Sequence, residues 1–206
     1  MIDLVRYLLI AGIRLLIGAR AEWAGARPVE RQRIYFANHA SHFDTLAVLA
    51  CLPPALRRRT HPVAARDYWA RTRFHRFIAE DCLRSVLIDR RRESAEDPLG
   101  PVLAALASGD SVLIFPEGTR GQGDAIGSFK SGLFHLARQV PKAELVPVHL
   151  DNLARIMPKG SFLVVPITCT ARFGAPLERI ADEPKEAFLA RARQAVVDLD
   201  TRRVAR

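Results

Sequence analysis

Two patterns of apolar and polar residues alternate along the chain, one typical of buried strands and the other typical of helices. Short apolar runs rich in β-branched and aromatic residues predict strands at 33–37, 61–65, 85–88, 111–115, 144–150 and 161–173. Segments with apolar residues at helical spacing predict helices at 42–51, 72–80, 98–108, 130–139 and 183–203. This alternation predicts an α/β fold, with a mostly buried mixed sheet flanked by helices.

The first 22 residues predict an amphipathic helix. Asp3, Arg6 and Arg14 fall in one sector of a helical wheel, and the rest of the wheel is apolar. A spanning helix needs roughly 20 mostly apolar residues, and these three charges interrupt the run. The pattern suits an interfacial helix with both arginines near lipid headgroups, and it equally suits a helix packed on the protein. We expect an interfacial helix over 1–22 and a single domain over 23–206.

The chain is strongly basic, with a net charge of +9 and a sequence pI of about 10.3. Such a surface attracts nucleic acid, anionic lipid or phosphorylated substrates. Nearly all the positive charge is arginine, with only four lysines, so genome base composition explains the excess equally well. Charge alone therefore does not choose among these partners.

A first candidate for chemistry lies between the predicted strand 33–37 and the helix that follows it. His39 lies in the turn, and Asp44 lies in the first helical turn, within reach of an imidazole ring. A carboxylate on one ring nitrogen fixes the tautomer and leaves the other nitrogen as a base. Two alternatives remain open. Ser41 and Asp44 have the spacing of a helix capping box, and His39, His42 and Asp44 could bind a metal.

A second candidate is the segment 115–120, with the sequence Phe-Pro-Glu-Gly-Thr-Arg. A carboxylate, a glycine, a hydroxyl and a guanidinium follow an apolar strand here. Active-site residues commonly lie at strand ends in α/β folds, and the guanidinium of Arg120 matches the geometry of a phosphate. The alternative is a surface turn with a local ion pair between Glu117 and Arg120.

Together the two segments resemble the glycerolipid acyltransferase superfamily, whose best-known members are the 1-acylglycerol-3-phosphate acyltransferases. The family has an Asn-His-x4-Asp box followed about 70 residues later by Phe-Pro-Glu-Gly-Thr-Arg, as this chain does. Its other landmarks are matched in order at 87–90, 129–132 and 146–148, with Leu87 in place of an aromatic residue. The resemblance covers about residues 33–150.

The resemblance implies an O-acyltransferase that moves a fatty acyl chain from acyl-CoA or acyl carrier protein to a lysophospholipid hydroxyl. The expected acceptor is 1-acylglycerol-3-phosphate, which would give phosphatidic acid; glycerol-3-phosphate or another lysolipid would use the same core. A thioester is already activated, so no metal and no cofactor beyond the acyl donor are expected. Because the acceptors are membrane lipids, we expect peripheral or monotopic attachment at the cytoplasmic face.

The resemblance also implies roles for the matching positions. His39 would be the general base and Asp44 its orienting partner. The expected substrate-binding residues are Arg66, Arg90, Glu117, Gly118, Thr119 and Arg120. Of these, Arg90 and Arg120 would bind the acceptor's phosphate, and backbone amides near Gly118 are candidates for stabilising the oxyanion.

A nucleic-acid-binding module is the alternative from a different class. It is suggested by the net charge and by arginine runs at 57–59 and 90–92. The chain contains no recognised nucleic-acid-binding motif, and the basic runs are dispersed among the acyltransferase landmarks. We therefore expect no nucleic-acid partner.

Overall fold

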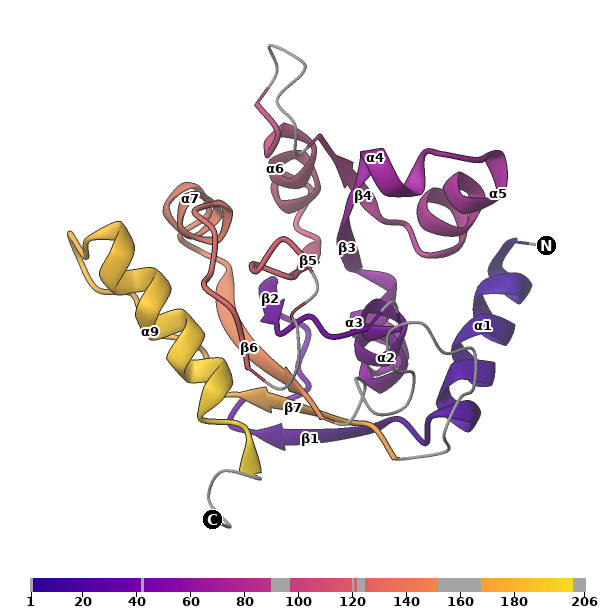
Figure 1. The fold of residues 1–206 in the computed structure, drawn as a ribbon, viewed down its shortest axis with the longest axis horizontal. Helices are drawn as coiled ribbons and strands as arrows, with labels where there is room; N and C mark the ends of the chain where they lie inside the picture. The colour runs from indigo at the N-terminus through magenta and orange to yellow at the C-terminus, as the bar shows by residue number, and fades with distance from the viewer. Residues whose placement is uncertain are drawn as a thin grey trace.

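The computed structural model describes residues 2–41, 43–89, 97–119, 121, 125–151 and 168–201. Within them a seven-stranded sheet runs in the order β1-β7-β6-β2-β5-β3-β4 (Figure 1). The strands are β1 (Arg20–Ala24), β2 (Arg33–Ala37), β3 (Thr60–Ala65), β4 (Val86–Ile88), β5 (Ser111–Ile114), β6 (Glu144–Leu150) and β7 (Thr170–Gly174). Strands β4, β3, β5, β2 and β6 are mutually parallel, and β7 is antiparallel to β6. The prediction of a mixed sheet in an α/β fold is confirmed.

Helices cover both faces of this sheet. They are α1 (Ile2–Leu16), α2 (Asp44–Cys51), α3 (Pro54–Arg58), α4 (Arg66–Trp69), α5 (Arg73–Arg76), the π-helix η1 (Phe77–Cys82), α6 (Gly100–Ala107), α7 (Gly132–Gln139) and α9 (Lys185–Val197). Tyr35 of β2 packs in the core formed with α1 and α2. Its neighbours Ile34 and Phe36 pack in the core formed with α6, α7 and α9. Strand β2 therefore has apolar side chains on both faces, which is why its sequence shows no polar alternation.

The register of the parallel strands brings both candidate segments to one edge of the sheet. Phe36 of β2 pairs with Ile114 of β5 and with Pro147 of β6. Since the carboxyl ends of parallel strands meet at the same edge, the turns after β2 and β5 are neighbours. His39 and the segment 115–120 come from these two turns, so the fold itself brings them together.

The N-terminal segment departs from the sequence prediction. Helix α1 ends at Leu16, and the chain turns at Gly18, where φ is +52°. Residues 20–24 then form β1, which pairs in parallel with β7. The prediction of helix up to residue 22 is therefore wrong at its end. Four of the five β1 residues are exposed, so this strand has no apolar pattern by which to recognise it.

Helix α1 has two apolar faces rather than one. Its inner face, with Ile10, Ile13 and Ile17, is buried on the protein. Its outer face exposes a row of leucines and a tyrosine: Leu4, Tyr7, Leu8, Leu15 and Leu16. Arg6 is only 9% exposed, so the expectation that both arginines lie at the membrane side is wrong for this residue. No helix among the described residues combines the length and the apolar character that crossing a bilayer requires.

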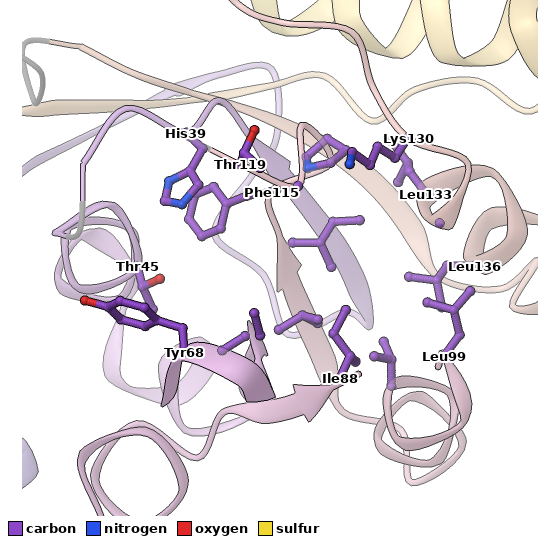
Figure 2. Close-up of a pocket in the computed structure, with 18 of the residues that line it drawn as sticks. His39, Thr45, Tyr68, Ile88, Leu99, Phe115, Thr119, Lys130, Leu133 and Leu136 are labelled. Atoms are coloured by element: carbon purple, nitrogen blue, oxygen red, sulfur yellow. The ribbon is translucent and has the colours of Figure 1, made fainter. Parts of the chain in front are cut away.

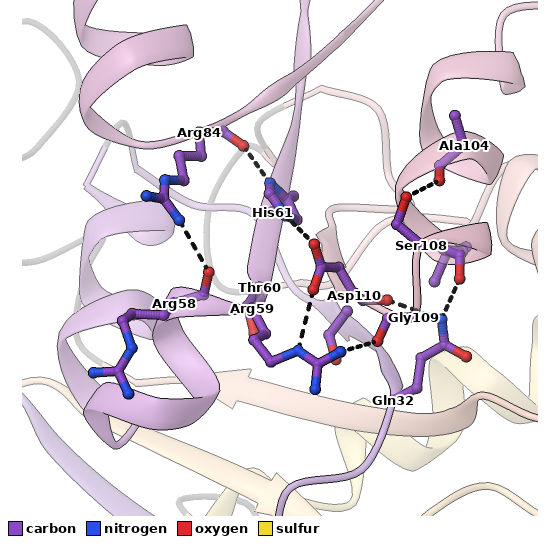
Figure 3. A network of polar contacts seen from close by, with 12 residues as sticks. Gln32, Arg58, Arg59, Thr60, His61, Arg84, Ala104, Ser108, Gly109 and Asp110 are labelled. Atoms are coloured by element: carbon purple, nitrogen blue, oxygen red, sulfur yellow. Dashed lines mark hydrogen bonds and ion pairs between the residues drawn. The ribbon is translucent and has the colours of Figure 1, made fainter.

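A polar network closes the opposite, amino edge of the sheet (Figure 3). Asp110, just before β5, accepts from His61 Nε2 at 3.0 Å and from Arg59 Nε at 3.2 Å. His61 Nδ1 lies 2.9 Å from the carbonyl oxygen of Arg84, just before β4. The network ties together the starts of three strands, and it gives His61 a structural role away from His39.

Two glycines provide a test of this packing. An added Cβ at Gly25 would lie 2.4 Å from the backbone nitrogen of Ala175, whereas one at Gly12 on α1 meets nothing within 4 Å. Gly25→Ala should lower the free energy of unfolding by about 1–3 kcal/mol, because backbone must move. Gly12→Ala should raise it by up to about 1 kcal/mol through helix propensity. Denaturant unfolding of both variants measures the two changes in free energy. Equal changes would contradict the close contact between Gly25 after β1 and Ala175 after β7.

Candidate active site

His39 and Asp44 form a tight pair at the carboxyl edge of the sheet. His39 Nδ1 lies 2.7 Å from Asp44 Oδ2, and the Asp44 side chain is completely buried. The same oxygen accepts from the backbone N–H of Ala40 at 2.6 Å and of Ser41 at 2.9 Å. A carboxylate held by two backbone donors cannot rotate freely, so it fixes the imidazole ring. The Nδ1–H tautomer that satisfies it leaves Nε2 as a base.

The capping alternative is partly correct and does not exclude the pair. Asp44 accepts from the backbone N–H of Ser41, as the acidic residue of a capping box does. The reciprocal bond is missing, because Ser41 Oγ accepts from the N–H of Phe43 instead, at 3.3 Å. Asp44 Oδ1 is buried without a hydrogen-bond partner among the described residues. One oxygen therefore orders both the helix start and the imidazole ring.

The segment 115–120 holds the backbone of His39 through the side chain of Glu117. Glu117 Oε1 accepts from the backbone N–H of His39 at 2.7 Å, and Oε2 accepts from the N–H of Gly127 at 2.8 Å. The N–H of Gly121 in turn donates to the carbonyl oxygen of His39 at 2.9 Å. Glu117 is only 6% exposed, so the alternative of a surface turn at this carboxylate is wrong. Glu117 therefore holds the backbone of His39 rather than facing solvent.

Two further residues complete the support of His39, and neither was assigned a role from its sequence position. The Asn38 side chain donates to the carbonyl oxygen of Leu150 at 3.1 Å and accepts from its N–H at 2.7 Å. This amide joins the end of β2 to the end of β6 just before His39. The His39 ring stacks on Phe115, with ring centroids 4.6 Å apart. The Asn38 bonds fix the backbone next to His39, and the Phe115 ring restricts the imidazole itself. The position of Asn38 beside His39 was the only signal for its role.

A cavity of about 510 Å³ opens beside His39 (Figure 2). It is lined by the described residues His39, Thr45, Val63, Ala64, Ala65, Tyr68, Trp69, Ile88, Leu99, Val102, Ile114, Phe115, Pro116, Gly118, Thr119, Lys130, Gly132, Leu133 and Leu136. Figure 2 shows His39, Thr45 and Tyr68 toward one end, with Leu99 and Leu136 toward the other. The cavity thus joins a polar end at His39 to an apolar end, which suits a ligand with a polar head and a hydrocarbon tail.

Two of the expected substrate-binding residues line this cavity, namely Gly118 and Thr119. Lys130 lines it as well and is the only lysine or arginine among its described lining residues. Gly118 has φ of +72°, and an added Cβ would lie 2.9 Å from Lys130 Cε. The positive φ favours glycine here, and a larger residue would also push the flexible Lys130 side chain aside.

Glu117 and Arg66, which were also expected to bind substrate, are not among the described lining residues of the cavity. The Glu117 carboxylate is bonded to backbone N–H groups of His39 and Gly127, as described above. Arg66 is exposed at the start of α4. Arg90 and Arg120 lie outside the described residues, so their roles remain predictions.

The metal alternative finds no support in the described part of the chain. No group of three or more His, Cys, Asp or Glu side chains there could hold a metal ion. His42, which the alternative also needs, lies outside the described residues.

Comparison with known proteins supports the same interpretation. A model of the Acyltransferase family matches residues 21–169. The 1-acyl-sn-glycerol-3-phosphate acyltransferase alpha of Homo sapiens is 32% identical over 150 residues, which are 70% of this chain and 50% of that protein. The 1-acyl-sn-glycerol-3-phosphate acyltransferase of Limnanthes alba is 28% identical over 165 residues, 79% of this chain and 56% of that protein. The chain thus spans about half the length of the curated relatives it matches.

The fold is similar to the crystal structure of the 1-acyl-sn-glycerophosphate acyltransferase PlsC from Thermotoga maritima. The TM-score is 0.73 at 19% sequence identity, and the match covers 99% of this chain and 83% of that one. The segment matched by the family model contains the His39–Asp44 pair and the turn at 115–120, which the fold brings together. The chain belongs to the Acyltransferase family.

Proposed function

We propose that this protein transfers a fatty acyl chain from acyl-CoA or acyl carrier protein to the free hydroxyl of 1-acylglycerol-3-phosphate, giving phosphatidic acid. The observation that carries the proposal is the His39–Asp44 pair at the polar end of an apolar cavity. The names of the matched relatives support this acceptor. The apolar end of the cavity, around Leu99 and Leu136, would hold a hydrocarbon chain.

The reaction needs one positioned base and no covalent intermediate on the protein. His39 Nε2 would take the proton of the acceptor hydroxyl as its oxygen attacks the thioester carbonyl carbon. The tetrahedral intermediate would then collapse, breaking the carbon–sulfur bond, and the imidazolium would return its proton to the departing thiolate. Such acid–base assistance contributes about 10²–10⁴-fold. Asp44 would stabilise the imidazolium through the bond to Nδ1.

One of the candidate groups for stabilising the oxyanion already has a hydrogen-bond partner. The N–H of Gly118, one of the candidates from the sequence, donates to the carbonyl oxygen of Phe115 at 3.0 Å. It is therefore already engaged within the turn. Lys130 is a cation beside this turn and lines the cavity, so it could offset negative charge there.

Recognition of the acceptor's phosphate would fall to the arginines predicted from the sequence. Arg120 directly follows Thr119, which lines the cavity. Arg90 follows β4 by two positions, and Ile88 at the end of that strand also lines the cavity. Each arginine is therefore only one or two positions along the sequence from a residue that lines the cavity. A guanidinium fork there could bind a phosphate with two hydrogen bonds.

Peripheral or monotopic attachment at the cytoplasmic face of a membrane is part of the proposal, because the acceptor is a lipid. Helix α1 supports it through its outer face, where Leu8 is 59% and Leu15 is 88% exposed. Exposed leucines in a row are costly in water and favourable in the interfacial region of a bilayer. The inner face of the helix is held by the protein, so the helix would lie flat on the membrane.

The function is tested by offering purified protein acyl-CoA and acyl carrier protein donors against several lyso-acceptors, with products measured by mass. We expect acylated 1-acylglycerol-3-phosphate, and a loss of about 10²–10⁴-fold in turnover for His39→Ala. Its unfolding midpoint should stay close to that of the parent protein. Products from glycerol-3-phosphate or another lysolipid alone would replace the proposed acceptor, and near-normal turnover of folded His39→Ala would refute the mechanism.

Asp44 variants separate orientation from charge. In Asp44→Asn the amide oxygen can still accept from Ala40, Ser41 and His39, so the ring orientation and the helix start should survive. Turnover should fall by about tenfold, because a hydrogen bond to a charged partner is worth roughly 1–1.5 kcal/mol more than a neutral one. Asp44→Ala should lose more turnover and also stability. Equal turnover of Asp44→Asn and the parent enzyme would show that the charge is not used.

Arg120 variants test the phosphate assignment. Arg120→Ala should raise KM for a phosphorylated acceptor by about tenfold or more, while KM for the acyl donor changes little. Arg120→Lys should recover little of this if the contact is bidentate. Steady-state kinetics with each substrate varied in turn gives both constants. An unchanged acceptor KM would remove Arg120 from the site, whereas lost stability without a KM effect would show a structural role.

A further inference from the structure

Three arginines gather where α1 ends. Arg14 comes from the last turn of α1, and Arg57 and Arg58 come from the last turn of α3. Burial lowers the pKa of Arg57, and the neighbouring charges of Arg14 and Arg58 lower it further. The strongest opposing influence is the Cys51 thiol, and no carboxylate is among the main causes of the shift. We call these three residues the arginine cluster.

Among the described residues, no ion pair neutralises the arginine cluster, whereas the next residue, Arg59, pairs with a carboxylate. Arg59 pairs with Asp110 at 3.2 Å, while Figure 3 shows the Arg58 guanidinium turned away from that carboxylate. Arg84 Nη1 donates to the carbonyl oxygen of Arg58 at 3.5 Å, which brings a fourth guanidinium close by. Arg57 Nη2 donates to the carbonyl oxygen of Leu52 at 3.0 Å, but its buried Nε has no hydrogen-bond partner among the described residues.

Helix dipoles explain only part of this arrangement. A cation in the last turn of a helix is stabilised by the macrodipole, which accounts for Arg14 and for an arginine in α3 taken singly. The charges of Arg14 and Arg58 both repel the half-buried guanidinium of Arg57, and burial strengthens such repulsion. Such a cluster is stabilised when an anion with several acceptor oxygens binds it.

The position of the cluster indicates which anion. Arg14 directly precedes Leu15, so it borders the exposed leucine row of α1. Residues that border the apolar face of an interfacial helix lie at the level of the lipid headgroups. The cluster is also remote from the catalytic pair, because Asp44 begins α2 and Arg57 follows its far end, eight residues or roughly 12 Å of helix away. It would therefore bind a different lipid from the one that reacts.

We propose that the arginine cluster binds the phosphate of an anionic phospholipid in the bilayer. This inference rests on the proposed attachment of α1 to the membrane and deepens it. Leucines alone would let the whole protein rotate about the axis of α1 in the interface. A phosphate bound on one flank, at Arg14, Arg57 and Arg58, fixes that rotation and so fixes how the protein faces the membrane.

Vesicle flotation of the full-length chain tests the proposal. The vesicles are phosphatidylcholine alone, or phosphatidylcholine with one-fifth phosphatidylglycerol. Arg57→Gln/Arg58→Gln should weaken binding to the anionic vesicles by about 25-fold, roughly fivefold for each charge at the surface, and should leave binding to neutral vesicles unchanged. The matched control is Arg138→Gln/Lys142→Gln, which removes the same charge from exposed positions at and beyond the end of α7 and should cost less than about threefold.

Equal losses for the two charge-matched pairs would overturn the proposal, because they would show only general attraction to negative charge. A raised KM for acyl-CoA in Arg57→Gln/Arg58→Gln, with the acceptor dispersed in detergent, would also overturn it, since the cluster would then bind the donor's phosphates. Arg14→Gln is the second variant if the double variant does not fold, with an expected loss of about fivefold.

The attachment of α1 to the membrane is tested separately, by vesicle flotation of the double variant Leu8→Gln/Leu15→Gln. This pair should weaken binding to neutral and anionic vesicles alike, by at least about tenfold, because two exposed leucines no longer leave water. Its control is Val29→Gln/Ile180→Gln, which removes two exposed apolar side chains outside α1. An unaffected leucine variant refutes α1 as the anchor, whereas an unaffected arginine variant refutes only the cluster, and neither result alters the test of acyl transfer.

Discussion

The geometry of the candidate active site depends on one buried carboxylate oxygen, Asp44 Oδ2. Asp44 Oδ2 accepts from two backbone N–H groups and faces His39 Nδ1, all within 2.9 Å. Because the backbone bonds hold this oxygen in place, the imidazole is oriented by the main chain as well as by a side chain. The same bonds order the first turn of α2, so the His39–Asp44 pair and the helix start form together. Under the proposed mechanism, a change at Asp44 acts on turnover and on stability at once.

The rest of the fold brings partners to this oxygen from distant parts of the sequence. Parallel strands β2, β5 and β6 end at one edge, and each contributes a contact there. Glu117 after β5 holds the backbone of His39, and Asn38 after β2 is bonded to Leu150 at the end of β6. The cavity extends from this edge along the sheet toward α6 and α7. The sheet thus places His39 at the polar end of the cavity, and contacts at the ends of three strands hold it there.

The sequence predicted most of this arrangement where the local pattern determines the structure. Strands 33–37 and 144–150 have the predicted bounds, because buried strands of a parallel sheet read as continuous apolar runs. Strand β1 was missed, since its pairing with β7 is a tertiary effect with no apolar signature. The positioning role of Glu117 was missed for the same reason: a motif identifies the residue type but not its hydrogen-bond partners. Similarly, the two faces of α1 appear only once its neighbours are known.

The central claim is that Asp44 holds His39 in the Nδ1–H tautomer with Nε2 free to act as a base. Nitrogen-15 NMR of the histidine rings measures this directly, because the two ring nitrogens give distinct shifts in each tautomer. We expect the neutral His39 ring of the free protein to carry its proton on Nδ1, and Asp44→Ala to lose this preference. A His39 ring protonated on Nε2, or one unaffected by Asp44→Ala, would contradict it.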